Sequence, residues 1–336
     1  METEVGGTGV LVTFDSGQPG KSLLFRAELD GLPIPEESDL PYKSVYEGKG
    51  HQCGHDGHLT ILAGVGAWLS RNPPKSGKVH LIFQPAEENG EGAKAVMQDE
   101  RFKALVFDEV YALHNLPGFP LGQIIVKDHS FTAAVNSIII QIKGKTSHAA
   151  EPEKGLNPSS AVAEILSGLA MFQHNDPESA DFRLITPVYV TMGSKDYGIS
   201  AGDAEIHLTL RSWTNEALAA LESNVTRLAK EVCKKHHLAF HHQFLAHFYA
   251  NENDPACVDA VRKAAASVGL PVLERFFPFK WGEDFGIITT RFKGCMFGLG
   301  SGEHQPALHN PDYDFPDELI PKGIAIFTAI IKNQLK

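Results

Sequence analysis

Apolar runs and polar turns alternate along the chain, and the length and composition of each run predict a strand or a helix. In the first third, strands are predicted at residues 10–14, 22–27, 78–83 and 107–113, and helices at 59–69 and 92–97. Because strands alternate with helices, this part of the chain is predicted to form a largely parallel sheet that is covered on both faces.

The pattern changes near Phe131. The next elements are predicted as a strand at 136–142, a helix at 159–173, strands at 184–192 and 205–212, a helix at 214–237 and a strand at 239–244. This order of strand, helix, two strands, helix and strand is typical of a small ferredoxin-like α+β domain.

The α/β pattern then resumes. Helices are predicted at 255–268, at 284–288 and from about 316 to the end, and strands at 272–276 and 295–299. We therefore predict a discontinuous α/β domain formed by residues 1–130 and 245–336, with residues 131–244 inserted as a second domain.

Composition and charge narrow the possible functions. The net charge of −11 argues against a nucleic-acid partner and gives no attraction to anionic membranes. No run approaches 18 consecutive apolar residues, and the first seven residues, acidic and then predicted to be flexible, differ from a secretory signal. Four widely spaced cysteines form no CxxC pair, which indicates reduced thiols and a cytoplasmic location.

The segment from His51 to His58 contains three histidines, one cysteine and one aspartate within eight residues. Core packing does not require such a density of metal-binding side chains. If the segment is extended, Cys53 and His55 point to the same side, since side chains alternate along an extended chain. These two residues could then bind one ion together.

Further candidate residues follow predicted strands. Glu87 and Glu88 come directly after one strand, His114 ends another, and His309 lies in a proline-containing loop before the last helix. A solvated turn is the alternative for the glutamate pair, and in a chain with 16 histidines a structural role is the alternative for each histidine. Taken together, however, one Cys, three His and one Glu suffice for a site with two ions.

Six motifs in a fixed order resemble those of the M20 metallopeptidase and aminoacylase family. The similarity is to its amidohydrolase branch, which includes hippurate hydrolases and auxin-conjugate hydrolases. The motifs are Cys-Gly-His-Asp-Gly-His at 53–58, Gln-Pro-Ala-Glu-Glu at 84–88, Leu-His-Asn-Leu-Pro at 113–117, Ser-His-Ala-Ala at 147–150, Gly-Glu-Asp-Phe at 282–285 and Leu-His-Asn-Pro-Asp-Tyr-Asp-Phe at 308–315. The resemblance implies a zinc-exopeptidase-like α/β/α catalytic domain with an inserted lid and dimerisation domain.

The resemblance also implies a role for each matching residue. The ligands of two divalent ions (Mn, Zn, Co or Ni) would be Cys53, His55, Glu88, His114 and His309, with Cys53 in the bridging position. Glu87 matches the general base, which accepts a proton from the metal-activated water and passes it to the leaving nitrogen.

Other matching positions are expected around that centre. His148 matches a lid histidine that stabilises the developing oxyanion and usually reaches the site of the partner subunit. Asp56, His58 and Asp284 are interpreted as groups that orient the ligands. Glu283 could either orient a ligand or be an acid at the N-terminus of a helix, and the second interpretation is favoured.

Several residues keep two interpretations. Arg211 could bind a substrate carboxylate or form a surface salt bridge, and Tyr197 is a candidate substrate contact. The histidines at 236, 237, 241, 242 and 247 resemble a metal cluster, but solvated surface histidines are favoured because they span a helix end and a strand. Cys233, Cys257 and Cys295 are expected to be buried thiols.

The chain departs from the family pattern at two places. Relatives usually begin with a helical segment of some tens of residues before the first strand, so the sequence is expected to be a fragment or a short form. Where relatives carry Asn followed by Ile-Pro, this chain has Tyr-Gly-Ile-Ser-Ala at 197–201, a stretch that contacts substrate in the family.

Three functions are weighed on these grounds. The first is hydrolysis of the amide bond of N-acyl amino acids by a homodimer joined through the inserted domain. The second is a dipeptidase or carboxypeptidase of the same fold. The third is a non-catalytic metal-binding or regulatory protein, which the presence of all five ligands and of Glu87 argues against.

Overall fold

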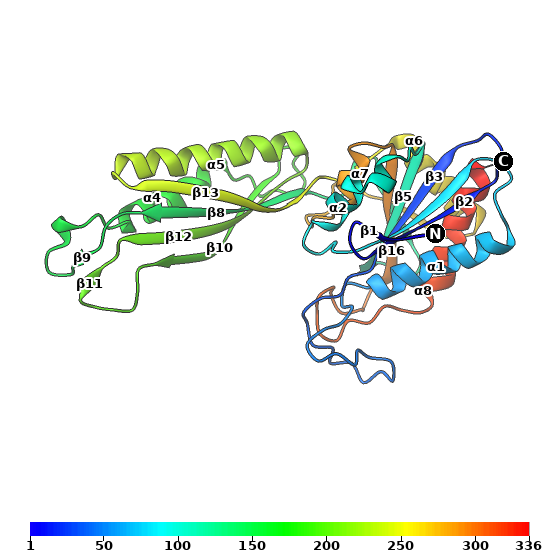
Figure 1. Cartoon of the computed structure of the whole chain (residues 1–336), viewed down its shortest axis with the longest axis horizontal. Coiled ribbons are helices and arrows are strands. Elements are labelled where there is room, and N and C mark those ends of the chain that lie inside the picture. The colour runs from blue at the N-terminus through cyan, green and yellow to red at the C-terminus, as the bar shows by residue number, and fades with distance from the viewer. Residues whose placement is uncertain (336) are drawn as a thin grey trace. The chain divides into compact units, whose positions relative to one another are not determined.

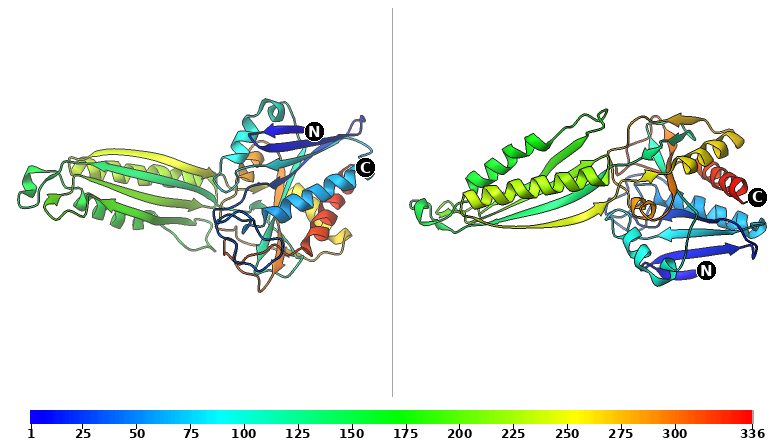
Figure 2. Two further views of the ribbon diagram at one scale, coloured as in Figure 1. Left: turned by 60° about the horizontal axis from the view of Figure 1, so that its bottom comes forward. Right: turned by 90° about the horizontal axis from the view of Figure 1, so that it is seen from above.

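The fold is taken from a computed structural model, of which residues 1–335 are described (Figures 1 and 2). The chain forms two compact units. Unit 1 consists of residues 1–131, 251–278 and those from 283 onward, and unit 2 consists of residues 132–250 and 279–282. No helix among the described residues is long and apolar enough to cross a membrane.

Unit 1 contains an eight-stranded mixed sheet. In spatial order its strands are β1 (Glu2–Val5), β2 (Gly9–Asp15), β4 (Lys78–Gln84), β3 (Ser22–Glu28), β5 (Glu109–Pro117), β16 (Gly294–Gly302), β6 (Ile124–Val126) and β15 (Val272–Glu274). The four central strands β4, β3, β5 and β16 are parallel, whereas β1, β2 and β6 each run antiparallel to a neighbour. The carboxyl ends of the central strands therefore meet at one edge of the sheet.

Helices cover both faces of this sheet (Figure 1). On one face, α1 (His55–Arg71), α6 (Pro255–Ser267) and α8 (Leu319–Gln334) enclose the main core with alternate residues of β3 such as Leu23 and Phe25. On the other face lie α2 (Gly92–Gln98) and α7 (Phe285–Thr289), with the short α3 (Glu100–Lys103) following α2. Side chains alternate along a strand, so Arg26 of β3 points to this second face.

Unit 2 has the predicted order of elements. Its strands and helices are β8 (Ala134–Lys143), α4 (Ser159–Gly168), β10 (Arg183–Met192), β12 (Asp203–Ser212), α5 (Asn215–Lys235) and β13 (Ala239–Phe248). The antiparallel sheet has the order β10-β12-β8-β13, the ferredoxin-like arrangement. Ile138 and Ile140 of β8 pack against Leu221 and Val225 of α5 to form its core.

Small elements complete the two units. In unit 1, β7 (His129–Ser130) pairs with β14 (Glu252–Asn253). In unit 2, β9 (Ser147–His148) pairs with β11 (Ile199–Ser200), and 3-10 turns lie at Pro152–Lys154 and Leu169–Phe172.

Three local predictions differ from the structure. Residues 2–5, for which no element was predicted, form β1, which pairs with β2, and Arg101 also donates hydrogen bonds to the carbonyls of Thr3 and Glu4 (2.7 and 2.8 Å). The helix predicted at 159–173 ends at Gly168 and continues only as a 3-10 turn. Strand β13 continues to Phe248, and the second boundary of unit 2 lies correspondingly near residue 250.

Candidate metal centre

The proposed ligands lie together at the carboxyl edge of the parallel strands of unit 1. Their donor atoms form overlapping groups in which all atoms lie within 4.8 Å of one another. One group contains Cys53, His55 and His114, and a second contains Cys53, Glu88 and His309. Cys53 is the member common to both groups, as a residue that bridges two ions would be.

The backbone around Cys53 differs from the predicted extended segment. Gly54 adopts a left-handed conformation (φ 87°) and caps α1, so His55 is the first residue of a helix. A Cβ at Gly54 would lie 2.7 Å from the side chain of Asn115, so the close approach also requires glycine. Cys53 and His55 face the same site, but a glycine turn brings this about and not strand alternation.

The two buried histidines present the nitrogen atoms that a metal ion needs. His55 donates from Nδ1 to the carbonyl of Asp30 (3.0 Å), and His114 donates from Nδ1 to the carbonyl of Asn115 (2.8 Å). In each ring Nε2 is thereby directed into the site, and that of His114 lies 3.7 Å from Cys53 Sγ. Such backbone contacts are the usual way in which metal-binding histidines are oriented.

Among the proposed ligands within residues 1–335, two buried atoms have no hydrogen-bond partner: Nε2 of His55 and Oε1 of Glu88. These atoms lie 3.8 Å apart, and Glu88 Oε1 lies 3.5 Å from Nε2 of His309. An unpaired buried polar atom costs about 1–3 kcal/mol, and a divalent cation between these atoms would remove that cost. The donor set of one thiol, three imidazoles and a carboxylate therefore fits a pair of transition-metal ions.

Glu87 is the buried carboxylate beside these groups. It is 5% exposed, and one of its oxygens lies 3.8 Å from Nε2 of His55. Burial, together with the negative charges of Glu283 and Asp284, raises the pKa of Glu87 well above its usual value. The preceding residue, Ala86, has a positive φ of 52°, an unusual conformation that turns the chain at the end of β4.

A buried ion-pair network lies beside Glu87, whose carboxylate is within 4.8 Å of those of Glu283 and Asp284. Arg26 donates to both oxygens of Glu283 (2.9 Å each), to Asp284 (2.6 Å), to Gln84 (3.0 Å) and to Glu28. Glu283 is therefore more than the acid at a helix N-terminus that the sequence suggested, although it also accepts from Phe285 N (3.0 Å).

Asp284 belongs to the same network. It accepts from Gln84 Nε2 (2.8 Å) and from Ala93 N (2.7 Å), and its hydrogen bonds reach no proposed ligand. Burial raises the pKa of Asp284 to about 8. Its hydrogen bonds to Arg26 and Gln84 join α7 to the ends of β3 and β4, and no direct contact supports the predicted role in orienting a ligand.

Asp56 does not orient a ligand in this structure. Its side chain is exposed and accepts a hydrogen bond from the N–H of Gly57 (2.9 Å). Asp30 instead contacts two of the candidate ligands: its carbonyl accepts from Nδ1 of His55 (3.0 Å), and its Oδ2 accepts from the N–H of Glu88 (3.0 Å). Sequence reasoning missed Asp30, although it follows a strand that ends at the site.

The candidates in unit 2 lie near its surface. His148 is exposed in β9 and accepts a hydrogen bond from Ala150 N (3.0 Å), and Tyr197 is 98% exposed. Arg211 donates to the carbonyl of Lys280 (2.7 Å), and within residues 1–335 it forms no ion pair, which was one of its two interpretations. The histidine cluster is dispersed: His236 contacts Glu164 (2.9 Å) on another helix.

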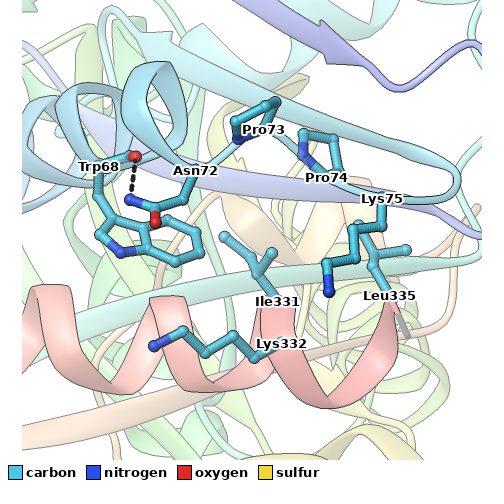
Figure 3. A pocket seen from close by; sticks show the side chains of 8 residues that line it. All are labelled: Trp68, Asn72, Pro73, Pro74, Lys75, Ile331, Lys332 and Leu335. Atoms are coloured by element: carbon cyan, nitrogen blue, oxygen red, sulfur yellow. Dashed lines mark hydrogen bonds between the residues drawn. The ribbon is translucent and has the colours of Figure 1, made fainter.

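A separate cavity of about 510 Å³ lies between the end of α1 and the end of α8 (Figure 3). Trp68, Asn72 and Lys75 line one side, and Ile331, Lys332 and Leu335 line the other. The ammonium of Lys332 lies 5.2 Å from the Trp68 ring centre. None of the proposed metal ligands lines this cavity.

Comparison with known proteins identifies the family. A model described as peptidase family M20/M25/M40 matches residues 24–333, so the chain belongs to this family. An N-acetyldiaminopimelate deacetylase from Bacillus pumilus (strain SAFR-032) is 29% identical over 334 residues, which cover 99% of this chain and 88% of the relative. An N-acetylcysteine deacetylase from Bacillus subtilis (strain 168) is 28% identical over 96% of this chain and 84% of the relative.

Solved structures agree with this assignment. A dinuclear metal-binding M20 peptidase from Bacillus subtilis superposes with a TM-score of 0.85 at 26% identity, covering 100% of this chain and 87% of the other. A putative aminohydrolase from methicillin-resistant Staphylococcus aureus gives a TM-score of 0.90 at 24% identity, with coverage of 100% and 87%, and supports the fold alone. The predicted family and the predicted α/β fold class are confirmed, and the deacetylase relatives agree with the predicted class of amidohydrolase.

Proposed function

We propose that this protein is a metal-dependent hydrolase that cleaves the amide bond of N-acyl amino acids. The observation that carries the proposal is the pair of ligand groups sharing Cys53, with the buried Glu87 beside them. The names of the deacetylase relatives support an amide substrate that joins an acyl group to an amino acid.

The ions would be held by Cys53, His55, His114, Glu88 and His309. When bound, two divalent ions lower the pKa of a water molecule and polarise the amide carbonyl. Glu87 accepts a proton from the attacking water and delivers it to the leaving nitrogen as the C–N bond breaks, which releases a carboxylate and an amino acid. Burial suits Glu87 to this task, because a raised pKa lets a carboxyl group hold the proton between the two steps.

Unit 2 supplies the remaining proposed contacts. His148 stabilises the developing oxyanion, and Arg211 and Tyr197 contact the substrate. The tip formed by β9 and β11 supports the first of these roles, because it presents the imidazole of His148 to the surface. His58, which contacts Glu28 and Asn115, is proposed to orient the ligands.

The metal is proposed to be zinc or manganese, with cobalt and nickel as substitutes. Thiolate and imidazole ligands favour zinc, and the carboxylate is a ligand that manganese also accepts. Elemental analysis of protein purified without chelator tests this assignment, which predicts two ions per chain.

A substrate panel tests the reaction. Metal-depleted protein is reloaded with Zn, Mn, Co or Ni and assayed on N-acetyl and N-benzoyl amino acids, with dipeptides alongside. We expect turnover of the N-acyl compounds that requires metal. If dipeptides alone are cleaved, the protein is instead a peptidase, the activity named for the Bacillus subtilis structure. Two bound ions with no cleavage of any amide would indicate the non-catalytic function.

Dimerisation through unit 2 and a cytoplasmic location are part of the proposal. Edge strand β10 supports the dimer, because Val188, Tyr189 and Val190 are 58%, 53% and 41% exposed along an unpaired sheet edge. Sedimentation should show a dimer for the wild-type protein. The substitution Val190→Lys should dissociate this dimer, whereas the control Met171→Lys, at an exposed position, should leave it intact. The proposed cytoplasmic location is supported by the four buried cysteines, which form no disulfide, as is usual in a reducing compartment.

A further inference from the structure

Asn115 is the residue on which the segments that carry the ligands converge. It follows His114 in β5 and is fully buried. Its carbonyl accepts the Nδ1 proton of His114, which fixes the orientation of that ring. No metal-binding role is assigned to its own side chain, whose amide is directed toward three other segments.

The first two segments belong to the start of α1. Asn115 Oδ1 lies 2.6 Å from Nε2 of His58, and the other ring nitrogen of His58 donates to Glu28 (2.8 Å). His58 is one helical turn after the ligand His55, so its ring fixes the rotation of the helix. The same amide packs so closely against Gly54 that no Cβ fits there, which fixes the turn that carries Cys53.

The third segment is the loop between β16 and α8. Asn115 Nδ2 donates to the hydroxyl of Tyr313, which is 2% exposed. Tyr313 lies four residues after the ligand His309, whose own side chain is 49% exposed and whose φ is +67°. A ligand that is exposed and in an unfavourable backbone conformation needs anchoring from elsewhere in its loop.

We propose that Asn115, through its bond to Tyr313, is a positioning residue that sets the separation of the two ligand groups. The inference rests on the proposed function, since it requires that these groups bind metal. One amide touches the Cys53 turn, the first turn of α1 and the His309 loop, and its backbone orients His114. Removing the Asn115 amide or the Tyr313 hydroxyl removes no ligand side chain, but the distance between the two ligand groups is then no longer fixed.

The test compares metal affinity in three variants. Tyr313→Phe removes only the hydroxyl, and Asn115→Leu removes the amide at nearly constant volume. Tyr111→Phe is the matched control. Tyr111 is a buried tyrosine on β5, the strand of Asn115, and its hydroxyl donates to Glu109 (2.6 Å) and not to Asn115. The affinity for Zn²⁺ is measured by competition with a chromophoric chelator, and the melting temperature is measured on metal-free protein.

Tyr313→Phe is expected to weaken Zn²⁺ binding about 10–100-fold, the usual loss when a group behind a ligand is removed. Tyr111→Phe should stay close to wild type in affinity, and the two tyrosine variants should melt at similar temperatures without metal. If Asn115→Leu does not fold, the Zn²⁺ affinity of Tyr313→Phe alone tests the inference. Wild-type affinity in Tyr313→Phe, or an equal loss in Tyr111→Phe, would overturn the inference. Failure of the wild type to bind Zn²⁺ would instead overturn the proposed function.

Discussion

Glu87 is the side chain on which the proposed chemistry depends most. It is buried next to His55, while Glu283 and Asp284 add negative charge and Arg26 opposes their effect. Its amide analogue keeps the shape of the side chain but cannot accept a proton.

Glu87→Gln should therefore lower kcat on N-acyl amino acids by about 10²–10⁴-fold, the range for loss of a general base. Metal content should stay at the wild-type value, because Glu88 and not Glu87 is the proposed ligand. Glu91→Gln, on an exposed side chain close by in sequence, is the control and should be fully active. Unchanged turnover in Glu87→Gln would disprove the mechanism.

Ala86 determines how the chain enters the site, because its φ of 52° turns the backbone just before Glu87. Glycine adopts this conformation freely, so Ala86→Gly should change the free energy of unfolding by less than about 1 kcal/mol and remain active. A β-branched residue is disfavoured there, so Ala86→Val should destabilise by about 1–3 kcal/mol. Chemical denaturation of both variants measures this difference, and equal stability would contradict the assigned strain.

The individual residues show where sequence reasoning succeeded and where it stopped. Candidate ligands could be chosen because Cys and His are rare in such density and because the motifs resemble a known family, and the structure brings their donor atoms together. Asp56 was misassigned because the segment is helical from His55 onward. In a helix, His55 and His58 share a face and Asp56 points elsewhere. Asn115 and Tyr313 could not be paired from the sequence, since only tertiary folding brings them together.

At the scale of elements, α1 shows how two glycines in one helix serve different purposes. A Cβ at Gly57 would lie 2.3 Å from the ring of Phe315, whereas a Cβ at Gly66 would lie 3.3 Å from a methyl group of Leu81. Gly57→Ala should therefore destabilise the metal-free protein by about 1–3 kcal/mol through overpacking.

Gly66→Ala is the matched comparison on the same helix. It should leave stability unchanged or raise it by up to about 1 kcal/mol, since alanine favours the helix more than glycine does. Urea denaturation of both metal-free variants gives the comparison. Equal effects of the two substitutions would show that contact with Phe315 is not the reason for glycine at position 57.

The pairing of β4 with β2 contains a buried histidine, His80, whose Nδ1 lies 2.9 Å from the hydroxyl of Thr13. Burial, with the nearby Lys78 charge, lowers the pKa of His80 to about 4 from its ordinary 6.5. The unfolded chain therefore binds the proton first as the pH falls. Neutral His80 therefore contributes to the free energy of unfolding, and this contribution is complete above about pH 6.5 and is lost toward pH 4.

His80→Gln removes that titration. The loss of stability between pH 7 and pH 4 should then be smaller than in the wild type, by up to about 3 kcal/mol. Comparing the two proteins at each pH cancels the other titrating groups. Parallel curves would show that His80 does not contribute.

Long periodic elements were predicted well because their core faces repeat locally. From Asn136 onward, strand β8 alternates buried residues with half-buried or exposed ones, and α5 places Leu218, Leu221 and Val225 on one face. Strand β1 has no apolar run of its own; it pairs with β2, and Arg101, far along the chain, donates to two of its carbonyls. Element type is therefore readable from local pattern in long elements, whereas a short edge strand such as β1 carries no such pattern.

For the whole molecule, the division into two units predicts a local response to metal. All five proposed ligands belong to unit 1, so metal binding should stabilise that unit by mass action. On chelation, hydrogen exchange should rise in α1, in the carboxyl end of β5 and in the loop that carries His309.

The core strand β8 and helix α5 of unit 2 serve as the internal control. Their exchange should not change on chelation, because no proposed ligand lies in that unit. A rise of the same size in both units would contradict a site confined to unit 1. The insertion itself was predictable, because the order of elements changes where it begins and ends.

The discontinuity of unit 1 also affects the order in which the chain can mature during synthesis. Cys53, His55, Glu88 and His114 leave the ribosome before unit 2, whereas His309 and Tyr313 follow it. Unit 2 can complete its own sheet while the first part of unit 1 still lacks β16 and α8. Under the proposed ligand assignment, the group of Cys53, Glu88 and His309 is therefore complete only after His309 has left the ribosome, by which time unit 2 has already been synthesised.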